Sequence, residues 1–258
     1  MSTLVMQPAH LAVRHLRALL RQPAYVVMQL VQPLIWLFLF GQLFKNVTSL
    51  PGFGGASYIS YLAPGVLVMS ALLSNGWSGT TYLVDMERGV LDRFLATPAR
   101  RSSLLIGQLA YWAALTAIQS ILLLALAFAG GARFAGGPLS IVSLVAAAVL
   151  LGMVMASFSN SLALRVRDQN TVIAANVILV LPLCFLSSVF LPQSLMPQWM
   201  QTVARFNPVN WAVDAGRQSI AAHVDWSIVL TRLGGLAMLA LVFGFAAVRS
   251  FRAYQRSL

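Results

Sequence analysis

The sequence predicts an all-α membrane protein, with residues 1–258 forming a single domain that contains six transmembrane helices. Of its 258 residues, 59% are hydrophobic and 9% are charged, whereas soluble domains carry about 25% charged residues. The apolar residues gather in six segments, and each is long enough to cross a hydrocarbon core of about 30 Å as a helix. A chain of this composition needs lipid around it, and it leaves no room for a second large domain.

The basic residues predict the orientation of the chain. They lie in short gaps between apolar segments rather than on one soluble face, which favours a positive-inside pattern over nucleic-acid binding. With the N-terminus inside, twelve basic residues fall on the inner side and five on the outer side. The inner set is Arg14, Arg17, Arg21, Arg88, Arg93, Arg100, Arg101, Arg165, Arg167, Arg249, Arg252 and Arg256, and the outer set is Lys45, Arg133, Arg205, Arg217 and Arg232. We therefore predict that both termini are cytoplasmic.

The N-terminal segment, residues 1–23, is basic and precedes the first span. Arg14, Arg17 and Arg21 share one face at helical spacing, and Pro23 limits the helix. An amphipathic helix on anionic lipid and a plain charged flank that sets topology fit this pattern equally well.

The six predicted spans follow in order, with a close pair in the middle. They cover residues 24–44, 59–84, 104–129, 139–164, 171–191 and 227–248. Residues 165–170 alone separate the fourth span from the fifth, so these two form a tight helical hairpin. Pro182 is expected to kink the fifth span.

The inner connection, residues 85–103, is too long to be a turn. Charged residues alternate there with apolar ones, and the stretch from Glu87 to Leu95 reads as a short amphipathic helix in which Arg88 and Asp92 can pair. Thr97-Pro98 ends this helix. Exposed apolar residues beside mixed charge suggest a docking surface; a solvated loop is the alternative.

The outer connection, residues 192–226, is punctuated by Pro192, Pro197 and Pro208. Asn207-Pro208 is a helix start, with Asn as N-cap and Pro in the first turn. Pro197 opens a preceding short helix that runs through Phe206. We expect two short interfacial or re-entrant helices before the last span.

The sequence lacks the groups that several kinds of chemistry need. It has no G-x-x-x-x-G-K-[ST] phosphate loop, so ATP hydrolysis would require another polypeptide. The carboxylates and histidines lie outside the interiors of the spans, which disfavours an ion-coupled carrier or channel, although unwound backbone carbonyls keep that alternative open. Gly76-Trp77-Ser78-Gly79 matches the G-x-S-G pattern of intramembrane proteases, but no histidine lies in a span to act as base. We expect no bound cofactor and no catalytic or metal site.

Some polar and aromatic residues at membrane depth are candidates for lining a transport path. The polar ones are Asn75, Gln108, Gln119, Asn160 and Asn176, and the aromatic ones include Trp36 and Phe40. The amides either line a polar path or bond between helices. The aromatic residues either line an apolar cavity or pack against their neighbours and lipid.

Three stretches in this order resemble the membrane permease of type-2 ABC exporters, in particular the drug-resistance group typified by daunorubicin exporters. The stretches are Tyr61-Leu-Ala-Pro-Gly-Val66; Glu87-Arg-Gly-Val-Leu-Asp-Arg-Phe-Leu-Ala-Thr-Pro98 with Arg100-Arg101 and Gly107-Gln108-Leu109; and Phe190-Leu-Pro192 with Pro197, Asn207-Pro208 and Arg217. The resemblance covers essentially the whole chain.

The resemblance implies a role for each connection. The inner loop would be a coupling helix seated on an ATPase subunit, through Glu87, Arg88, Gly89, Asp92, Arg93, Phe94 and Leu95. Residues 1–23 would be the connecting helix beside it, and residues 192–226 would be the paired re-entrant helices over the path. Two permeases, identical or sister chains, and two ATPase subunits carrying ATP and Mg would work together in the bacterial inner membrane. The expected cargo is a lipophilic or amphiphilic compound: a drug, an antibiotic, a lipid or a lipid-linked glycan.

Overall fold

All six predicted apolar segments form helices. A computed structural model describes residues 23–44, 58–88, 102–221 and 223–255, and this part of the chain contains helices and no strand. The long helices are α2 (Pro23–Leu43), α3 (Tyr58–Gly76) continued by α4 (Ser78–Glu87), α6 (Ser102–Ala129), α7 (Gly137–Val166), α8 (Gln169–Phe185) and α11 (Trp226–Gln255). The short ones are η2 (Gln193–Leu195), α9 (Gln198–Phe206) and α10 (Pro208–Ile220). The all-α prediction is confirmed.

Among the described residues, four helical segments are long and apolar enough to cross a membrane, by length and composition. They are α3 with α4, α6, α7 and α11, while α2 and α8 are shorter apolar helices in the described part of the chain. The fifth predicted span, residues 171–191, extends beyond the helix that the structure contains. α8 stops at Phe185, because polar side chains of α10 bind the backbone that follows it, as described below.

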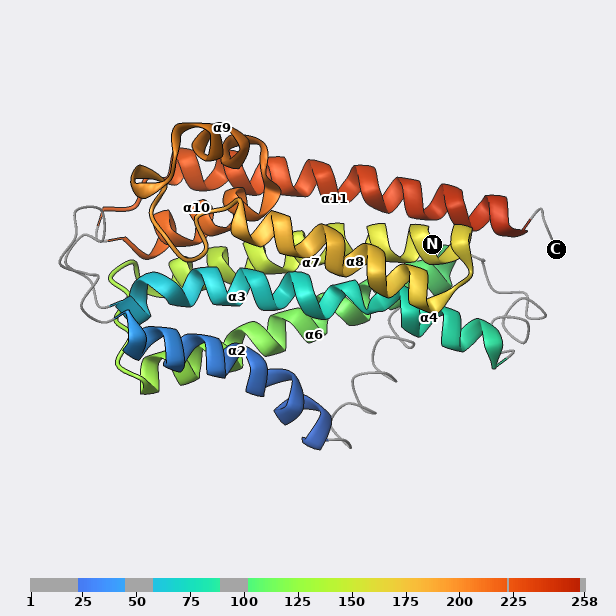
Figure 1. The fold of residues 1–258 in the computed structure, drawn as a ribbon, viewed down its shortest axis with the longest axis horizontal. Coiled ribbons are helices and arrows are strands. Elements are labelled where there is room, and N and C mark those ends of the chain that lie inside the picture. Colours follow the sequence, from blue (N-terminus) through green and yellow to red (C-terminus); the bar gives the residue numbers. More distant parts are fainter. Residues whose placement is uncertain (1–22, 45–57, 89–101, 222, 256–258) are drawn as a thin grey trace.

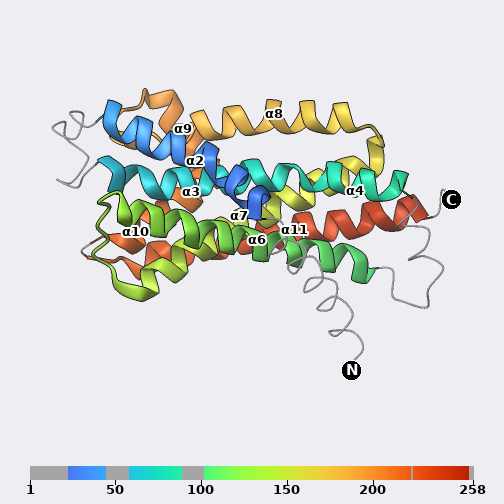
Figure 2. The same cartoon turned by 90° about the horizontal axis from the view of Figure 1, so that it is seen from below.

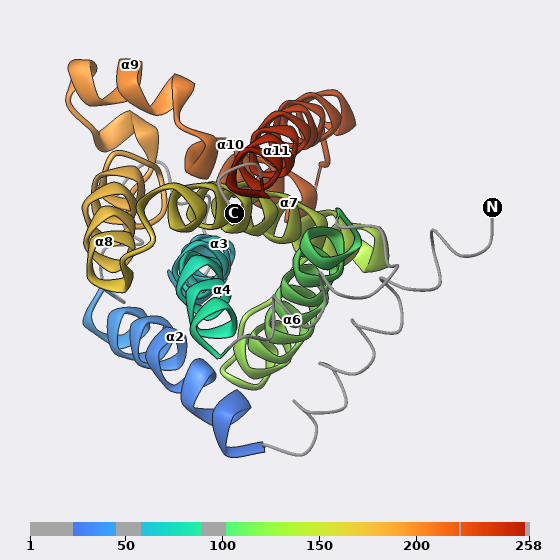
Figure 3. The same cartoon turned by 90° about the vertical axis from the view of Figure 1, so that its right-hand side faces the viewer.

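The second span lies at the centre of the bundle. Figure 3 shows α3 and α4 enclosed by α2, α6, α7 and α8, with α11 packed outside α7. In its most apolar 18-residue stretch, 83% of the α3–α4 span is buried, against 11% for α11. Small residues make this close packing possible: a Cβ added at Gly79 would lie 2.4 Å from the Ser159 carbonyl oxygen.

The helices run lengthwise, so that the connections gather at two ends (Figures 1 and 2). α9 and α10 lie at one end, which we call the outer end. The end of α4, the start of α6 and the α7–α8 hairpin lie at the opposite, inner end.

The hairpin between the fourth and fifth predicted spans is confirmed. α7 ends at Val166 and α8 begins at Gln169, and Arg167 between them adopts a left-handed φ of 58°. Asp168 is the N-cap of α8: its carboxylate accepts hydrogen bonds from Thr171 N at 2.8 Å and Thr171 Oγ1 at 2.6 Å. These bonds lower the pKa of the Asp168 carboxyl.

Candidate functional site

The outer end is built around Asn207, whose predicted role as N-cap of α10 is confirmed. Its Oδ1 accepts the hydrogen bond of Val209 N at 2.9 Å, and Pro208 stands in the first turn. Its Nδ2 donates to Leu183 O at 2.7 Å and Leu186 O at 2.9 Å, two carbonyls at the end of α8. One side chain thus serves the end of one helix and the start of another. The predicted helix after Pro197 is also confirmed as α9, which runs through Phe206.

Two further side chains of α10 bind the irregular backbone that follows α8. Asn210 Oδ1 accepts a hydrogen bond from Ser188 N at 3.0 Å, and Arg217 Nη2 donates to Val189 O at 3.0 Å. These bonds replace the helical ones that residues 187–191 would have made as part of the predicted fifth span. The backbone N–H of Ser188 and the backbone carbonyl of Val189 thus keep hydrogen-bond partners where the chain leaves the helix.

Arg217 also ties this region to the start of the second span. Its guanidinium carbon lies 3.7 Å from the centre of the Tyr61 ring, and its Nε donates to Tyr61 O at 3.4 Å. A Cβ at Gly65 would lie 2.4 Å from Val189 O, so glycine is needed where α3 approaches the loop. Two of the stretches that carry the family resemblance, far apart in sequence, thus meet in one packed group. We call it the outer cluster: Tyr58, Tyr61, Gly65, Val189, Asn207, Asn210 and Arg217.

Sequence reasoning missed two polar members of α10. Asn210, Asp214 and Arg217 recur at the spacing of one helix face, which was the available signal. Asn210 Nδ2 donates to Asp214 Oδ2 at 3.1 Å, and the same oxygen lies 3.5 Å from Arg232 of α11. Burial raises the pKa of the Asp214 carboxyl, and the two arginines oppose that rise.

The second predicted span corresponds to one apolar helical segment, Tyr58–Glu87. It is interrupted at a single residue, Trp77, between α3 and α4, and we call this interruption the break. The Gly76 carbonyl accepts hydrogen bonds from Asn176 Nδ2 and Ser159 Oγ, both at 2.6 Å. Gly79 N donates to Ser159 Oγ at 3.2 Å, and Gln108 Nε2 donates to Ser78 O at 3.2 Å. Side chains of α6, α7 and α8 thus satisfy the backbone groups around the break, as a span at membrane depth requires.

Three of the five candidate amides, Asn75, Asn160 and Asn176, lie near this break. Asn75 Nδ2 donates to Thr116 Oγ1 at 2.7 Å, and Asn160 Oδ1 accepts a hydrogen bond from Ser78 Oγ at 3.0 Å. Together with Asn176, they bond between helices, which was one of the two interpretations. Ala156 O, at 3.1 Å, is a second acceptor for the single Ser78 hydroxyl proton. Both acceptors are amide oxygens. Within the described residues no three His, Cys, Asp or Glu side chains group to hold a metal.

The two candidate aromatic residues of α2 lie in a strip that leads to the outer cluster. Trp36 and Phe40 have ring centroids 4.8 Å apart, and each lies within 6 Å of the ring of Phe190, at 5.7 and 5.8 Å. The ring of Phe44, the residue directly after α2, lies 5.7 Å from the ring of Tyr58.

The two predicted prolines of the outer segment differ in burial. Pro192, two residues after Phe190, is buried, whereas Pro197 at the start of α9 is exposed.

At the inner end, the structure describes the first two residues of the predicted coupling set. α4 continues to Glu87, beyond the predicted start of the inner loop at residue 85, and Gln169 Nε2 donates to both Glu87 carboxylate oxygens at 3.3 and 3.4 Å. Arg88 follows, exposed, as the C-cap of α4. Gly89, Asp92, Arg93, Phe94 and Leu95 lie outside the described residues, as do the N-terminal segment up to residue 22 and the first outer loop.

Comparison with known proteins identifies the family. The family model for ABC-2 type transporters matches residues 6–221. A putative transport permease, ycf38, of Porphyra purpurea is 30% identical over 209 residues, which cover 80% of this chain and 71% of that protein.

Two bacterial relatives extend the comparison. The daunorubicin resistance ABC transporter permease protein DrrB1 of Streptomyces coeruleorubidus is 28% identical over 234 residues, or 88% of this chain and 78% of that protein. Nodulation protein J of Rhizobium leguminosarum bv. trifolii is 27% identical over 233 residues, or 86% and 84%. The family model matches most of this chain, and the chain contains several long apolar helices. The chain is therefore a multi-pass membrane protein of the ABC-2 type transporter family.

Proposed function

We propose that this chain is the permease subunit of an ATP-driven exporter, which moves a lipophilic or amphiphilic compound out of the cytoplasm or inner leaflet. Two permeases and two ATPase subunits form the working unit, and ATP and Mg bind the ATPase subunits. The complex resides in the bacterial inner membrane with both permease termini in the cytoplasm.

The observation that carries this proposal is the place of α4, the helix that leads into the inner loop. α4 runs without interruption into Glu87 and Arg88, the first residues of the proposed coupling set. The same helix continues the central span of the bundle (Figure 3). A force on the loop would therefore act directly on α4, which packs mainly against α7. Gln169 of α8 also contacts α4, through its hydrogen bonds to Glu87. Arg93, Phe94 and Leu95 dock on the ATPase subunit, with Phe94 as the apolar anchor.

At the outer end, we propose that α9 and α10 form the re-entrant segment that covers the path. Trp199, Val203 and Phe206 are exposed and share one face of α9, which suits a helix lying at the lipid headgroups. Asn207 holds α10 against the end of α8, and Arg217 holds it against Tyr61 of the second span. Trp36 and Phe40 line the path below it.

Purification of the tagged chain from its native membrane tests the proposal. We expect a soluble partner with a G-x-x-x-x-G-K-[ST] loop in equal amount, and ATPase activity in the complex. A chain that purifies alone and transports without ATP would instead be a carrier or channel.

A further inference from the structure

Side chains of two neighbouring helices hold the central segment at its break. Ser159 Oγ of α7 donates to Gly76 O at 2.6 Å and accepts hydrogen bonds from Gly79 N at 3.2 Å and Asn176 Nδ2 at 3.1 Å. Its single proton and both of its lone pairs are therefore used. Asn176 Nδ2 of α8 also donates to Gly76 O, at 2.6 Å. We call Ser159 and Asn176 the clamp.

The two backbone groups that the clamp binds would also find partners inside an unbroken helix. With regular helical bonds throughout the segment, Gly76 O would accept from Thr80 N, and Gly79 N would donate to Asn75 O. Two arrangements therefore satisfy these groups at membrane depth, one through α7 and α8 and the other through the segment itself. An element with two such arrangements has two discrete conformations, one interrupted and one continuous.

The backbone at Trp77 already departs from the regular α-helical pattern. Trp77 N donates to Ser74 O at 3.3 Å, three residues earlier, and such a tightened turn inside a long helix often marks a hinge. Thr80 Oγ1 and Thr81 Oγ1 both donate to Trp77 O, at 2.8 and 3.2 Å. Hydroxyls that bond back to the preceding turn favour a bend in a helix. The local geometry therefore suits a change of direction at Trp77.

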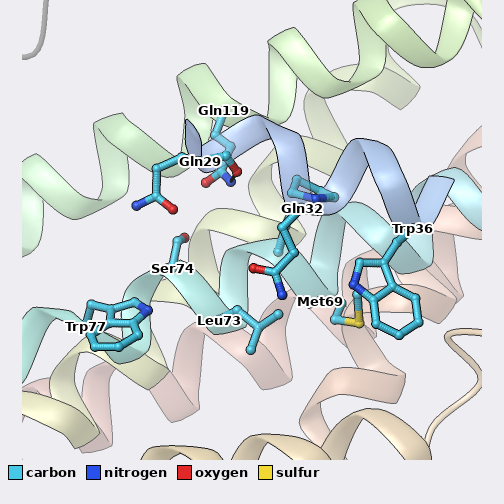
Figure 4. A pocket seen from close by; sticks show the side chains of 10 residues that line it. Gln29, Gln32, Trp36, Met69, Leu73, Ser74, Trp77 and Gln119 are labelled. Atoms are coloured by element: carbon cyan, nitrogen blue, oxygen red, sulfur yellow. Dashed lines mark hydrogen bonds between the residues drawn. The ribbon is translucent and has the colours of Figure 1, made fainter. Parts of the chain in front are cut away.

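Trp77 has room to follow such a change. Its side chain is 50% exposed, and Figure 4 shows its indole beside a small hollow that Ser74 and Gln119 also line. A rotation of the backbone here does not force a buried ring through a close-packed core. By contrast, α7 runs without interruption from Gly137 to Val166 and packs against both α3 and α4. It is therefore a continuous surface along which α4 can shift.

We infer that the break at Trp77 is a two-position hinge, and that Ser159 and Asn176 are the positioning residues that hold its interrupted position. Release of the clamp lets Gly76 and Gly79 form helical bonds, and α4 then changes direction relative to α3. For its role in transport this inference rests on the proposed function, because a movement of the inner loop reaches the centre of the bundle through α4 and this hinge.

Distances between two spin labels test the hinge in the purified chain in phosphatidylcholine nanodiscs. The labels are attached to Arg88→Cys at the end of α4 and Arg249→Cys on α11, two exposed positions, in a Cys184→Ala background that lacks the buried native cysteine. Ser159→Ala then removes the hydroxyl of the clamp. We expect a second distance, a minor population in the parent, to gain about tenfold in relative population, the effect of losing one or two buried hydrogen bonds.

A second variant favours the continuous helix without removing a hydrogen bond. The nearest atom to a Cβ added at Gly76 is 3.6 Å away, on Met155, which is an ordinary contact. Alanine is favoured over glycine inside a helix, so Gly76→Ala is expected to raise the second population about twofold to fivefold, even if Ser159→Ala folds poorly. Ser161→Ala is the matched control on α7, because the Ser161 hydroxyl donates to Ser157 O of its own helix at 2.7 Å. It should give the distances of the parent.

Two outcomes overturn the inference. A single, unchanged distance in the parent, Ser159→Ala and Gly76→Ala proteins would mean that the break is rigid. An equal rise of the second population in Ser161→Ala would mean that substitutions on α7 loosen the bundle in general. Neither measurement involves the ATPase subunit, whereas the proposed export function fails separately, if no ATPase subunit co-purifies with the chain.

Discussion

At the scale of single residues, Asn207 shows how much a local signal predicts. Asn followed by Pro predicts a helix start because both residues act within one turn, and the bond to Val209 N is present. The bonds from the same side chain to Leu183 and Leu186 join segments more than 20 residues apart. The residues next to Asn207 in the sequence do not predict these two hydrogen bonds. The same holds for Arg217, whose partner Tyr61 is 156 residues away.

Asn207→Ala is expected to destabilise the protein by roughly 1–3 kcal/mol, because it removes an N-cap and two buried donors. Asn207→Asp keeps the oxygen that accepts the N-cap hydrogen bond, but it places a second oxygen against two carbonyl oxygens. We therefore expect the Asn207→Asp protein to be no more stable than the Asn207→Ala protein. Asn170→Ala, at an exposed position of α8, is the control and should change little. Thermal unfolding in one detergent compares the three. An unchanged midpoint for Asn207→Ala would contradict the double role of this residue.

Asp168 gives a prediction about pH. Its pKa is lowered in the folded protein by the Thr171 hydroxyl and then by the Thr171 amide. The ionised Asp168 side chain therefore stabilises the folded protein fully at pH values above the pKa of an aspartate in the unfolded chain. This stabilisation is lost as the pH falls through the lower pKa that Asp168 has in the folded protein. Asp168→Asn keeps a good N-cap that does not titrate. We expect the difference in melting midpoint between parent and variant to shrink as the pH is lowered below about 4. A difference that stays constant with pH would refute a stabilising role of the ionised Asp168 carboxylate.

At the scale of helices, hydrophobic length predicted the existence of every long segment but not where helices break or end. Residues 59–84 were predicted as one span, and Tyr58–Glu87 does form one apolar helical segment, but the sequence did not indicate its interruption at Trp77. Gly76, Ser78 and Gly79 permit the break, yet it is stable only because Ser159, Asn176 and Gln108 bind the backbone there. α8 ends early for a similar reason. Such partners come from distant helices, so apolar length alone overestimates helical continuity.

The close packing of α4 on α7 predicts a strong effect of volume at Gly79. In Gly79→Ala, the new Cβ would meet Ser159 O at 2.4 Å and Ser159 Oγ at 2.5 Å. We expect a loss of about 1–3 kcal/mol, reduced by the better helix propensity of alanine. Gly244→Ala on α11 is the control, since no atom lies within 4 Å of its added Cβ; it should be neutral or slightly stabilising. Equal melting midpoints for the two variants would mean that α4 is not held closely against α7.

At the scale of the whole molecule, composition and charge predicted a helical membrane protein, and the family match covers most of the chain. The arrangement of the helices was not predictable from one sequence. The central place of α3 and α4 follows from small residues and inter-helix amides, which are distributed over several helices. Glu87 and Arg88, the first two residues of the proposed coupling set, stand at the end of this central segment.

The most direct test of the central claim is the effect of Phe94→Ala on the purified complex, with Phe206→Ala, an exposed phenylalanine at the outer end, as the matched control. A buried interface anchor contributes about 2–4 kcal/mol to binding. We therefore predict that the Phe94→Ala permease inserts into the membrane normally, and that its affinity for the ATPase subunit falls by roughly 30-fold to 1,000-fold. Phe206→Ala should keep it. Unchanged association and ATP hydrolysis in Phe94→Ala would contradict the proposed coupling role of the inner loop.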